Sequence, residues 1–202
     1  MLWLDSADSV APALPAVWLI ATGTHPRDLD ERSVLRRGTA RRVLARQLGC
    51  REDDVVIAHE PVGRPVLARP EAPEFRLSLA TRAGVVAIAV AREPIGVDVE
   101  RVEAKMAPPL DVLHPDERAF LDATALATRP RAFAQLWAAK EAYVKALGTG
   151  FLRPPESFAV SLLSEGAFRV ADPLRPADIV GQLHLMKNGD QDILAAAAIV
   201  LA

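Results

Sequence analysis

Acidic and basic side chains in two short segments of the sequence are spaced so that they can act together. In segment 95–100, Ile-Gly-Val-Asp-Val-Glu, a strand would place Asp98 and Glu100 on one face, because strand side chains alternate. In segment 137–145, Trp-Ala-Ala-Lys-Glu-Ala-Tyr-Val-Lys, a helix would align Trp137, Glu141 and Lys145. Two carboxylates from a strand and one from a helix can hold a hard cation such as Mg²⁺.

Each segment alone also has a simpler interpretation. An acidic pair after a strand often only solvates its end, and a Glu-to-Lys pair one helical turn apart is a common surface feature worth ~0.2–0.5 kcal/mol. Trp137 fits a core position as well as a ligand contact. The combination of both segments in one chain favours a functional site.

Hydrophobic periodicity and turn residues predict alternating helices and strands. The segment 28–48 begins with acidic residues, is followed by Gly49, and predicts a helix with a buried stripe of Val34, Leu35, Val43, Leu44 and Leu48. Two further helices are expected, one from 114 to about 121 and a longer one from 129 or 130 to Gly148. Strands are expected at 16–21, 55–58, 65–67, 75–79, 85–90, 95–99, 158–163, 181–186 and 193–201.

These elements predict an α+β chain with two similar α/β subdomains and a site in the cleft between them. The run 85–90 is apolar on both faces and predicts a central strand. Pro108-Pro109 follows the acidic pair closely, so we place the halves at residues 1–105 and 106–202.

Composition excludes several classes of protein. The chain has 202 residues, is half hydrophobic, and has a net charge of −2, which argues against a general nucleic-acid binder. The single Cys50 forms no internal disulfide, the start lacks the basic residues of a signal peptide, and the apolar segment 193–202 is too short to span a bilayer. We expect a cytoplasmic protein without a membrane segment.

The two segments together resemble the signature of the 4′-phosphopantetheinyl transferases, in particular the surfactin-type, pseudo-dimeric class. The Gly-Val-Asp-Val-Glu segment at 96–100 and the Trp-to-Lys segment at 137–145 have the residue types and order of its two main motifs. Gly63-Arg64-Pro65 is similar to a glycine-basic-proline element of the family. Segments 75–78, Phe-Arg-Leu-Ser, and 114–117, His-Pro-Asp-Glu, resemble two further elements.

The resemblance implies transfer of the phosphopantetheine arm of coenzyme A to a serine of an apo acyl or peptidyl carrier protein, with release of adenosine 3′,5′-bisphosphate. It places Asp98, Glu100 and Glu141 around magnesium. Glu141 would be the general base, directly or through water, and Lys145 would contact a phosphate and steady the departing charge. Lys140 is turned about a hundred degrees around the helix from Glu141, so it is not assigned. The class predicts a functional monomer.

Arginines of the first helix are candidates for holding coenzyme A. Arg37 and Arg41 are spaced to share a face, and with Arg64 they are predicted to bind its phosphates, with Ser78 as a further contact implied by the resemblance. Six arginines on this helix also fit a solvated face or a nucleic-acid contact.

One position departs from the family pattern. After Leu77-Ser78 the family commonly has a histidine that contacts a phosphate of coenzyme A, and this chain has Leu79. The sequence leaves three possibilities: neighbouring arginines such as Arg82 replace the histidine contact, coenzyme A binds weakly, or the ligand differs. The alternative to an active enzyme is therefore a catalytically impaired protein that binds coenzyme A or a carrier protein and retains the fold.

Overall fold

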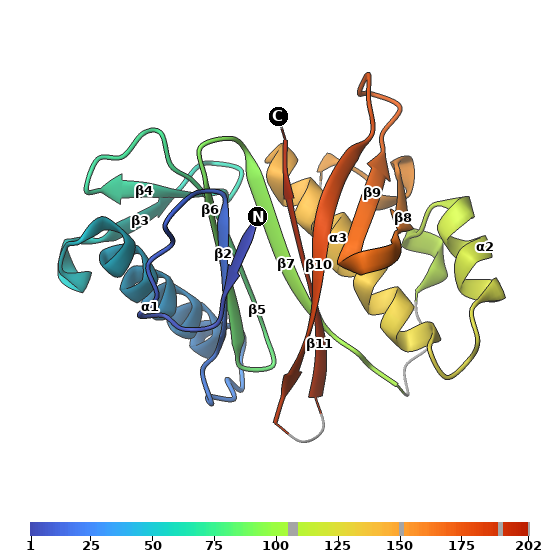
Figure 1. Ribbon diagram of the computed structural model, residues 1–202, viewed down its shortest axis with the longest axis horizontal. Coiled ribbons are helices and arrows are strands. Elements are labelled where there is room, and N and C mark those ends of the chain that lie inside the picture. The colour runs from blue at the N-terminus through green and yellow to red at the C-terminus, as the bar shows by residue number, and fades with distance from the viewer. Residues whose placement is uncertain (105–108, 150–151, 190–191, 202) are drawn as a thin grey trace.

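The computed structural model describes residues 1–104, 109–149, 152–189 and 192–201, which form the predicted α+β fold (Figure 1). The α-helices of these residues are α1 (Leu29–Leu48), α2 (Pro115–Ala123) and α3 (Arg129–Leu147). The strands of the first part are β1 (Leu2–Leu4), β2 (Ala16–Ala21), β3 (Val56–His59), β4 (Pro65–Arg69), β5 (Arg76–Arg82), β6 (Val85–Ala91) and β7 (Ile95–Arg101). The later strands are β8 (Ala159–Leu162), β9 (Ala167–Ala171), β10 (Ile179–Asn188) and β11 (Asp192–Val200).

The strands form two larger sheets and a hairpin. The first sheet has the order β1-β2-β6-β5, with β1 parallel to β2 and the remaining neighbours antiparallel. The second has the antiparallel order β7-β11-β10-β9-β8, and β3 pairs with β4 separately. Strand β7 therefore belongs to the same sheet as strands that follow it by about 60 residues or more in the sequence.

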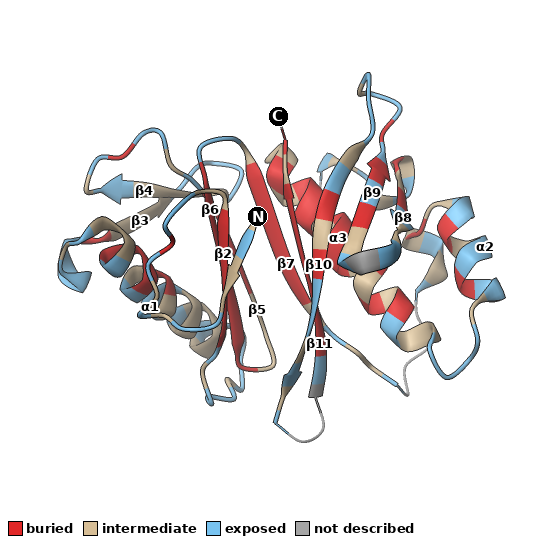
Figure 2. Ribbon diagram, in the orientation of Figure 1, coloured by how far each residue is buried: buried red, intermediate tan, exposed pale blue. Residues whose placement is uncertain are grey.

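Apolar side chains divide these elements into four layers. One cluster, which includes Val43, Leu44 and Ile88, packs α1 against the first sheet. A second cluster, which includes Val17, Ala87 and Val97, lies between the two sheets. A third packs α3 against the second sheet. The order is helix, sheet, sheet, helix, and Figure 2 shows the buried residues concentrated on the central strands and on α3.

The helix ends follow the predicted capping residues. Asp28 Oδ1 accepts a hydrogen bond from the Glu31 backbone N–H at 2.8 Å, and Gly49 ends α1 in the left-handed conformation at φ 67°. Gly148 ends α3 in the same way at φ 68°. In α2, His114 and Glu117 form a reciprocal capping box.

Most predicted elements are present within a few residues of their expected bounds, and β6 is the central, fully buried strand that its sequence predicts. Strands β1 and β9 were not expected. Val34 is 64% exposed, so its assignment to the buried stripe of α1 is wrong. The boundary predicted between residues 105 and 106, and Pro108 beside it, lie outside the described residues.

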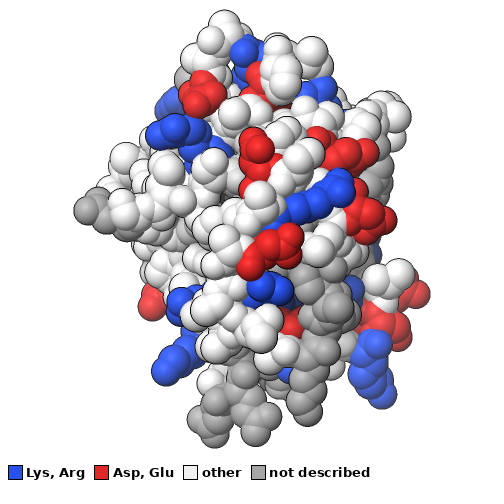
Figure 3. All heavy atoms as spheres, turned by 90° about the vertical axis from the view of Figure 1, so that its right-hand side faces the viewer, with Lys and Arg blue, Asp and Glu red and all other residues white. Residues whose placement is uncertain are grey.

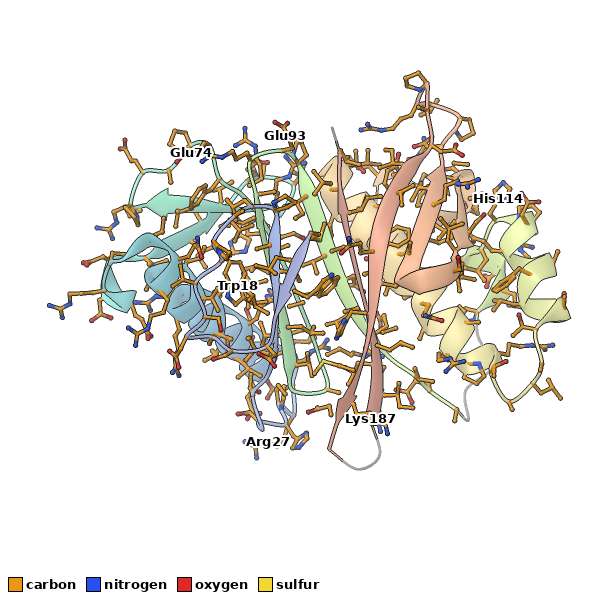
Figure 4. The ribbon with its side chains drawn as sticks, in the orientation of Figure 1. Trp18, Arg27, Glu74, Glu93, His114 and Lys187 are labelled. Atoms are coloured by element: carbon orange, nitrogen blue, oxygen red, sulfur yellow. The ribbon has the colours of Figure 1, made fainter. Side chains whose placement is uncertain are left out.

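Charged side chains lie at the surface of this framework, together with exposed apolar residues such as Leu126 and Leu174. Figure 4 shows Trp18 inside the molecule, whereas Arg27, Glu74 and Lys187 lie at its periphery. On the face shown in Figure 3, basic and acidic side chains are interspersed rather than segregated. Across the described residues, we find no helix with the length and apolar character needed to cross a membrane.

Candidate active site

A glycine lets helix α3 approach strand β7 closely. A Cβ atom at Gly96 would lie 1.8 Å from the backbone oxygen of Ala142 in α3, so a side chain here would force the helix and strand apart. Gly96, Asp98 and Glu100 lie on one face of β7, while Val97 and Val99 face the core between the sheets, as the alternation predicts. The acidic residues of β7 therefore lie on the face that packs against α3.

Asp98 and Lys145 form an ion pair across this contact. Lys145 Nζ donates to Asp98 Oδ1 at 2.6 Å and to the Val97 carbonyl at 3.2 Å. The Asp98 side chain is 9% exposed and that of Lys145 is 31% exposed. Within the described part of the chain, the buried Asp98 Oδ2 has no hydrogen-bond partner. An unsatisfied buried carboxylate oxygen is costly, and such atoms often mark functional sites.

Glu100 and Glu141 join this pair electrostatically. Burial raises the pKa of Glu100 to about 7, and the Asp98 charge adds to this, although Arg82 opposes it from 3.4 Å. Burial and Asp98 also raise the pKa of Glu141, against the opposing charge of Lys145. Burial raises the pKa of Asp98 itself, and Lys145 again opposes the effect. Groups from β7 and α3 therefore form one coupled site, with shifted pKa values of the kind that functional sites often show.

The acidic residues are suited to a cation, although they do not form a finished metal site. In the residues described, no three acidic, histidine or cysteine side chains are close enough to hold a metal by themselves. Asp98 instead contacts Lys145, and Glu100 contacts Arg82. The free Oδ2 of Asp98 is an acceptor that a cation would satisfy, and Mg²⁺ often needs only one or two carboxylates beside the phosphates of a substrate. The donor set fits Mg²⁺ bound together with such a substrate.

A cavity of about 200 Å³ opens beside Lys145 and provides a place for an anionic ligand. The side chains around it that carry or can accept a positive charge are Arg36, His59, Arg64 and Lys145. None of the described residues that line it is acidic, and part of its wall is apolar, with Val62, Pro65, Leu77 and Leu79. The buried Ser78 also lines it, and its Oγ accepts a hydrogen bond from the Val97 backbone N–H at 3.0 Å.

Arg64 connects the cavity to the end of α3. Its guanidinium approaches the Ala146 carbonyl at 3.5 Å, where a cation complements the negative end of the helix dipole. A Cβ atom at Gly148 would lie 1.6 Å from Arg64 Nη2, so glycine leaves room for this side chain as well as for the positive φ. The sequence-predicted Arg64, Ser78 and Lys145 are thus brought together at one cavity.

Other arginines lie elsewhere. Arg41 donates to the Glu52 carbonyl at 2.8 Å and contacts Asp53, and Arg37 is an exposed residue that is not among those lining the cavity. Their predicted contact with coenzyme A stays a prediction. Arg82 pairs with Glu100 and lines a different cavity. Sequence reasoning did not assign Arg36 and His59 to a site. Both are basic residues in or beside predicted elements, but neither belongs to a motif.

A second cavity, of about 250 Å³, lies on the other flank of the acidic group. Four charged residues line it, Arg82, Glu100, Arg101 and Glu103. Its other lining residues are apolar and include Phe133 and Trp137, whose rings stack 6.3 Å apart. Lys145 borders the first cavity and Glu100 the second. The coupled acidic group therefore adjoins both a cationic cavity and a largely apolar one.

Lys140 is not part of this site. Its ammonium lies in the interior, where it contacts Glu117 Oε1 at 2.7 Å and donates to the carbonyls of Pro155 and Phe158. The sequence predicted that Lys140 lies on a different helical face from Glu141, and the structure confirms this prediction. Sequence reasoning did not identify Glu117 as the partner of Lys140. The spacing of His114 and Glu117 indicates only a capping box at the start of a helix.

Comparison with known proteins identifies relatives of the segment that carries this site. A family model described as the 4′-phosphopantetheinyl transferase superfamily matches residues 94–198, which contain β7 and α3. The 4′-phosphopantetheinyl transferase gsp of Aneurinibacillus migulanus is 26% identical over 130 residues, which cover 63% of this chain and 52% of that protein.

Two more relatives carry the same enzyme name, one of them as putative. A putative 4′-phosphopantetheinyl transferase, slr0495, of Synechocystis sp. is 32% identical over 130 residues, covering 62% of this chain and 52% of that protein. A 4′-phosphopantetheinyl transferase of Bacillus subtilis is 27% identical over 115 residues, covering 55% of this chain and 49% of that protein. The chain spans about half the length of the curated relatives it matches.

Proposed function

This chain belongs to the 4′-phosphopantetheinyl transferase superfamily, and we propose that it transfers the 4′-phosphopantetheine arm of coenzyme A to a serine of an apo carrier protein. The observation that carries this proposal is the interacting group of Asp98, Glu141 and Lys145 beside a cavity whose described charged lining residues are all basic. The matched segment contains β7 and α3, the two elements that supply this group.

The cationic cavity suits the nucleotide part of coenzyme A. Guanidinium and ammonium groups from Arg36, Arg64 and Lys145 can meet phosphate oxygens, for which planar arginine is well adapted. The apolar wall can face the adenine ring. The second cavity, with its stacked aromatic rings, suits the less polar pantetheine arm, so the bond to be broken would lie near the acidic group between them.

Asp98, Glu100 and Glu141 are our candidates to hold Mg²⁺ at this position. The Oδ2 of Asp98, unpartnered among the described residues, and the raised pKa values of these carboxyl groups support a site that a further positive charge would stabilise. A bound cation would neutralise pyrophosphate oxygens and so reduce their repulsion of an attacking hydroxyl.

Two residues of α3 are proposed to handle the proton and the leaving charge. The carrier serine oxygen forms a bond to phosphorus while the bond between that phosphorus and the bridging oxygen of the pyrophosphate breaks. Glu141, with a raised pKa, accepts the serine proton directly or through water. Lys145 contacts a phosphate and stabilises the charge on departing adenosine 3′,5′-bisphosphate, and this requires it to share or exchange its contact with Asp98.

The layered fold suggests an internal pairing of two similar subdomains, as in the surfactin-type class. Helix α1 covers the first sheet and α3 covers the second, and the two sheets pack together. We propose that residues 1–105 and 106–202 correspond to these halves, with β7 completing the sheet of the second. A chain that carries both halves would act as a monomer.

A second candidate function follows from Leu79. This residue lines the cationic cavity and offers no hydrogen bond or charge to a phosphate where the family commonly has histidine. A protein that binds coenzyme A or a carrier protein, with impaired catalysis, would fit this observation. The intact group of Asp98, Glu100, Glu141 and Lys145 favours the active enzyme.

Intact-mass spectrometry tests the proposal directly. Several apo carrier proteins are incubated with the protein, coenzyme A and Mg²⁺, with a chelator control and a Glu141→Gln control. We expect a metal-dependent mass gain of one phosphopantetheine arm on at least one carrier. If no carrier gains mass although coenzyme A binds, the binding function replaces the transferase.

A further inference from the structure

Two basic side chains from different elements contact the acidic residues of β7. Lys145 of α3 contacts Asp98 at 2.6 Å, and Arg82, the last residue of β5, contacts Glu100 at 3.4 Å. Strand β5 lies at the edge of the first sheet and β7 at the edge of the second, so the Arg82–Glu100 pair joins the two sheets. Each carboxylate of β7 that is a candidate ligand for Mg²⁺ therefore has a cation of this chain beside it.

The two cations act on the whole acidic group and not only on the residue that each contacts. Burial raises the pKa of Asp98 and of Glu100, and the charges of Lys145 and Arg82 oppose this rise for both residues. Lys145 also opposes the rise in the pKa of Glu141, which burial causes. The charges of the three carboxylates are thus largely balanced when all these groups are ionised. A divalent ion gains little from such a group, because repulsion by the two cations offsets much of the attraction by the carboxylates.

A pyrophosphate would change this balance. It carries a negative charge on each phosphorus, so it can contact a lysine or arginine and a metal ion at the same time. Lys145 lines the first cavity, whereas Arg82 and Glu100 line the second, so a ligand that extends between the cavities can reach both cations. Mg²⁺ is commonly held by one or two carboxylates together with substrate phosphates. The ion and the pyrophosphate therefore suit this group better as a pair than either does alone.

We propose that Lys145 and Arg82 set the order of binding, because they make the acidic group a weak site for Mg²⁺ alone and a stronger one for Mg²⁺ together with a pyrophosphate. This inference rests on the proposed function, which supplies the ligand. It assigns a task to Arg82, which lines the second cavity rather than the cationic one. It also gives Lys145 a second task, since the ammonium that contacts the phosphate repels a metal ion that arrives alone.

Calorimetric titration with Mg²⁺ tests the inference without turnover. The ion is titrated into the protein alone and into the protein saturated with coenzyme A, without a carrier, and the heat of Mg²⁺ binding to free coenzyme A is subtracted. All titrations are made at about pH 8.5, above the pKa of about 7 of Glu100, so that the carboxylates are charged. Wild type should bind Mg²⁺ about tenfold or more tightly when coenzyme A is present.

Removing either cation should change the affinity for Mg²⁺ in the absence of coenzyme A. Lys145→Gln and Arg82→Gln should each tighten it by about tenfold, because each variant removes a unit charge that repels the ion. The ratio of the affinities with and without coenzyme A should fall in both variants and fall furthest in the double variant. The Arg82 side chain is 38% exposed, so Arg82→Gln keeps the test available if the loss of Lys145 beside Asp98 destabilises the fold.

Matched controls remove the same charge elsewhere. Lys187, at the periphery in Figure 4, and Arg92 are both exposed, and Lys187→Gln and Arg92→Gln should keep the wild-type affinities. If wild type binds Mg²⁺ equally well with and without coenzyme A, or if neither site variant binds the ion more tightly than these controls, the inference fails while the proposed transfer stands. If no variant and no wild type binds Mg²⁺ even with coenzyme A, the proposed role of magnesium fails and takes the inference with it.

Discussion

Helix α3 carries two lysine–carboxylate pairs only five residues apart, and they have opposite character. Lys140 is 1% exposed, Glu117 is 0% exposed, and the lysine ammonium has Glu117 and two backbone carbonyls as partners. The Phe158 ring also lies 4.3 Å from this ammonium. Glu117 in turn accepts from the Val160 N–H at 2.7 Å and from the His114 N–H at 2.9 Å.

The Asp98–Lys145 pair is less complete. Lys145 borders a cavity, and the second oxygen of Asp98 is buried without a partner in the described residues. The neighbouring carboxylates Glu100 and Glu141 have raised pKa values, partly because of the Asp98 charge. A lysine ammonium has three protons to donate; Lys140 has three acceptors, whereas the described residues supply two to Lys145.

The difference separates a structural pair from a functional one on the same helix. A fully satisfied buried network fixes α2 and β8 against α3, because Glu117 lies in the first turn of α2 and contacts β8. An unsatisfied network carries a cost that a ligand can relieve. The two lysines of one sequence motif therefore have different tasks: Lys140 holds the helix in place, and Lys145 faces the proposed substrate.

Isosteric amide variants should separate the two pairs most clearly. Glu117→Gln removes the charge opposite Lys140 and should lower the free energy of unfolding by about 3–5 kcal/mol, the usual result of breaking a buried pair. Asp98→Asn should change this free energy by no more than about 1 kcal/mol, because the variant removes a poorly satisfied buried charge. Urea denaturation measures both. Equal losses for the two variants would contradict the comparison.

A second prediction concerns turnover rather than stability. Glu141→Gln should lower kcat for carrier modification by about 100-fold or more, since general base catalysis has at least this magnitude. Its stability should be equal or slightly higher, because the amide removes repulsion with Asp98. Glu93→Gln, an exposed residue at the periphery in Figure 4, is the control and should keep wild-type kcat. Near-normal turnover of Glu141→Gln would remove Glu141 from the mechanism.

The sequence predicted the framework well because its signals were local. Capping by Asp28 and the glycines at 49 and 148 set the ends of α1 and α3, and the apolar run of β6 indicated a central strand. Alternation along β7 placed Asp98 and Glu100 on one face. Such properties depend on neighbours in the chain, so a single sequence contains them.

The rest depends on which side of an element meets another element. Adjacent arginines on a helix differ by about a hundred degrees, and the sequence did not show that Arg36, rather than Arg37, borders the cavity. The partner of Lys140 lies 23 residues earlier, on another helix. Val34 was predicted to lie in the buried stripe because it is apolar, yet most of its surface is exposed.

Tyr143, the only tyrosine of the chain, allows a further test of the buried contacts of α3 whose polar groups are paired. The Tyr143 hydroxyl donates to Asp172 Oδ2 at 2.7 Å, and burial together with this acidic partner raises the pKa of Tyr143 to about 12. An unfolded tyrosine loses its proton near pH 10. The unfolded state therefore releases this proton first, and stability should fall as the pH rises from about 10 towards about 12. Tyrosinate absorbance should appear together with unfolding, and its appearance near pH 10 in the folded chain would contradict the prediction.

The smallest effect is expected at position 79, which lines the cavity beside Lys145. Leu79 is 8% exposed and packs in the core cluster beneath α1, so Leu79→His should cost some stability, which thermal denaturation can measure. This variant should tighten coenzyme A binding by up to about tenfold, because an imidazole would then face the cavity. Leu79→Gln controls for polarity without the imidazole. If the affinity for coenzyme A does not change, its phosphate is held elsewhere and position 79 does not limit binding.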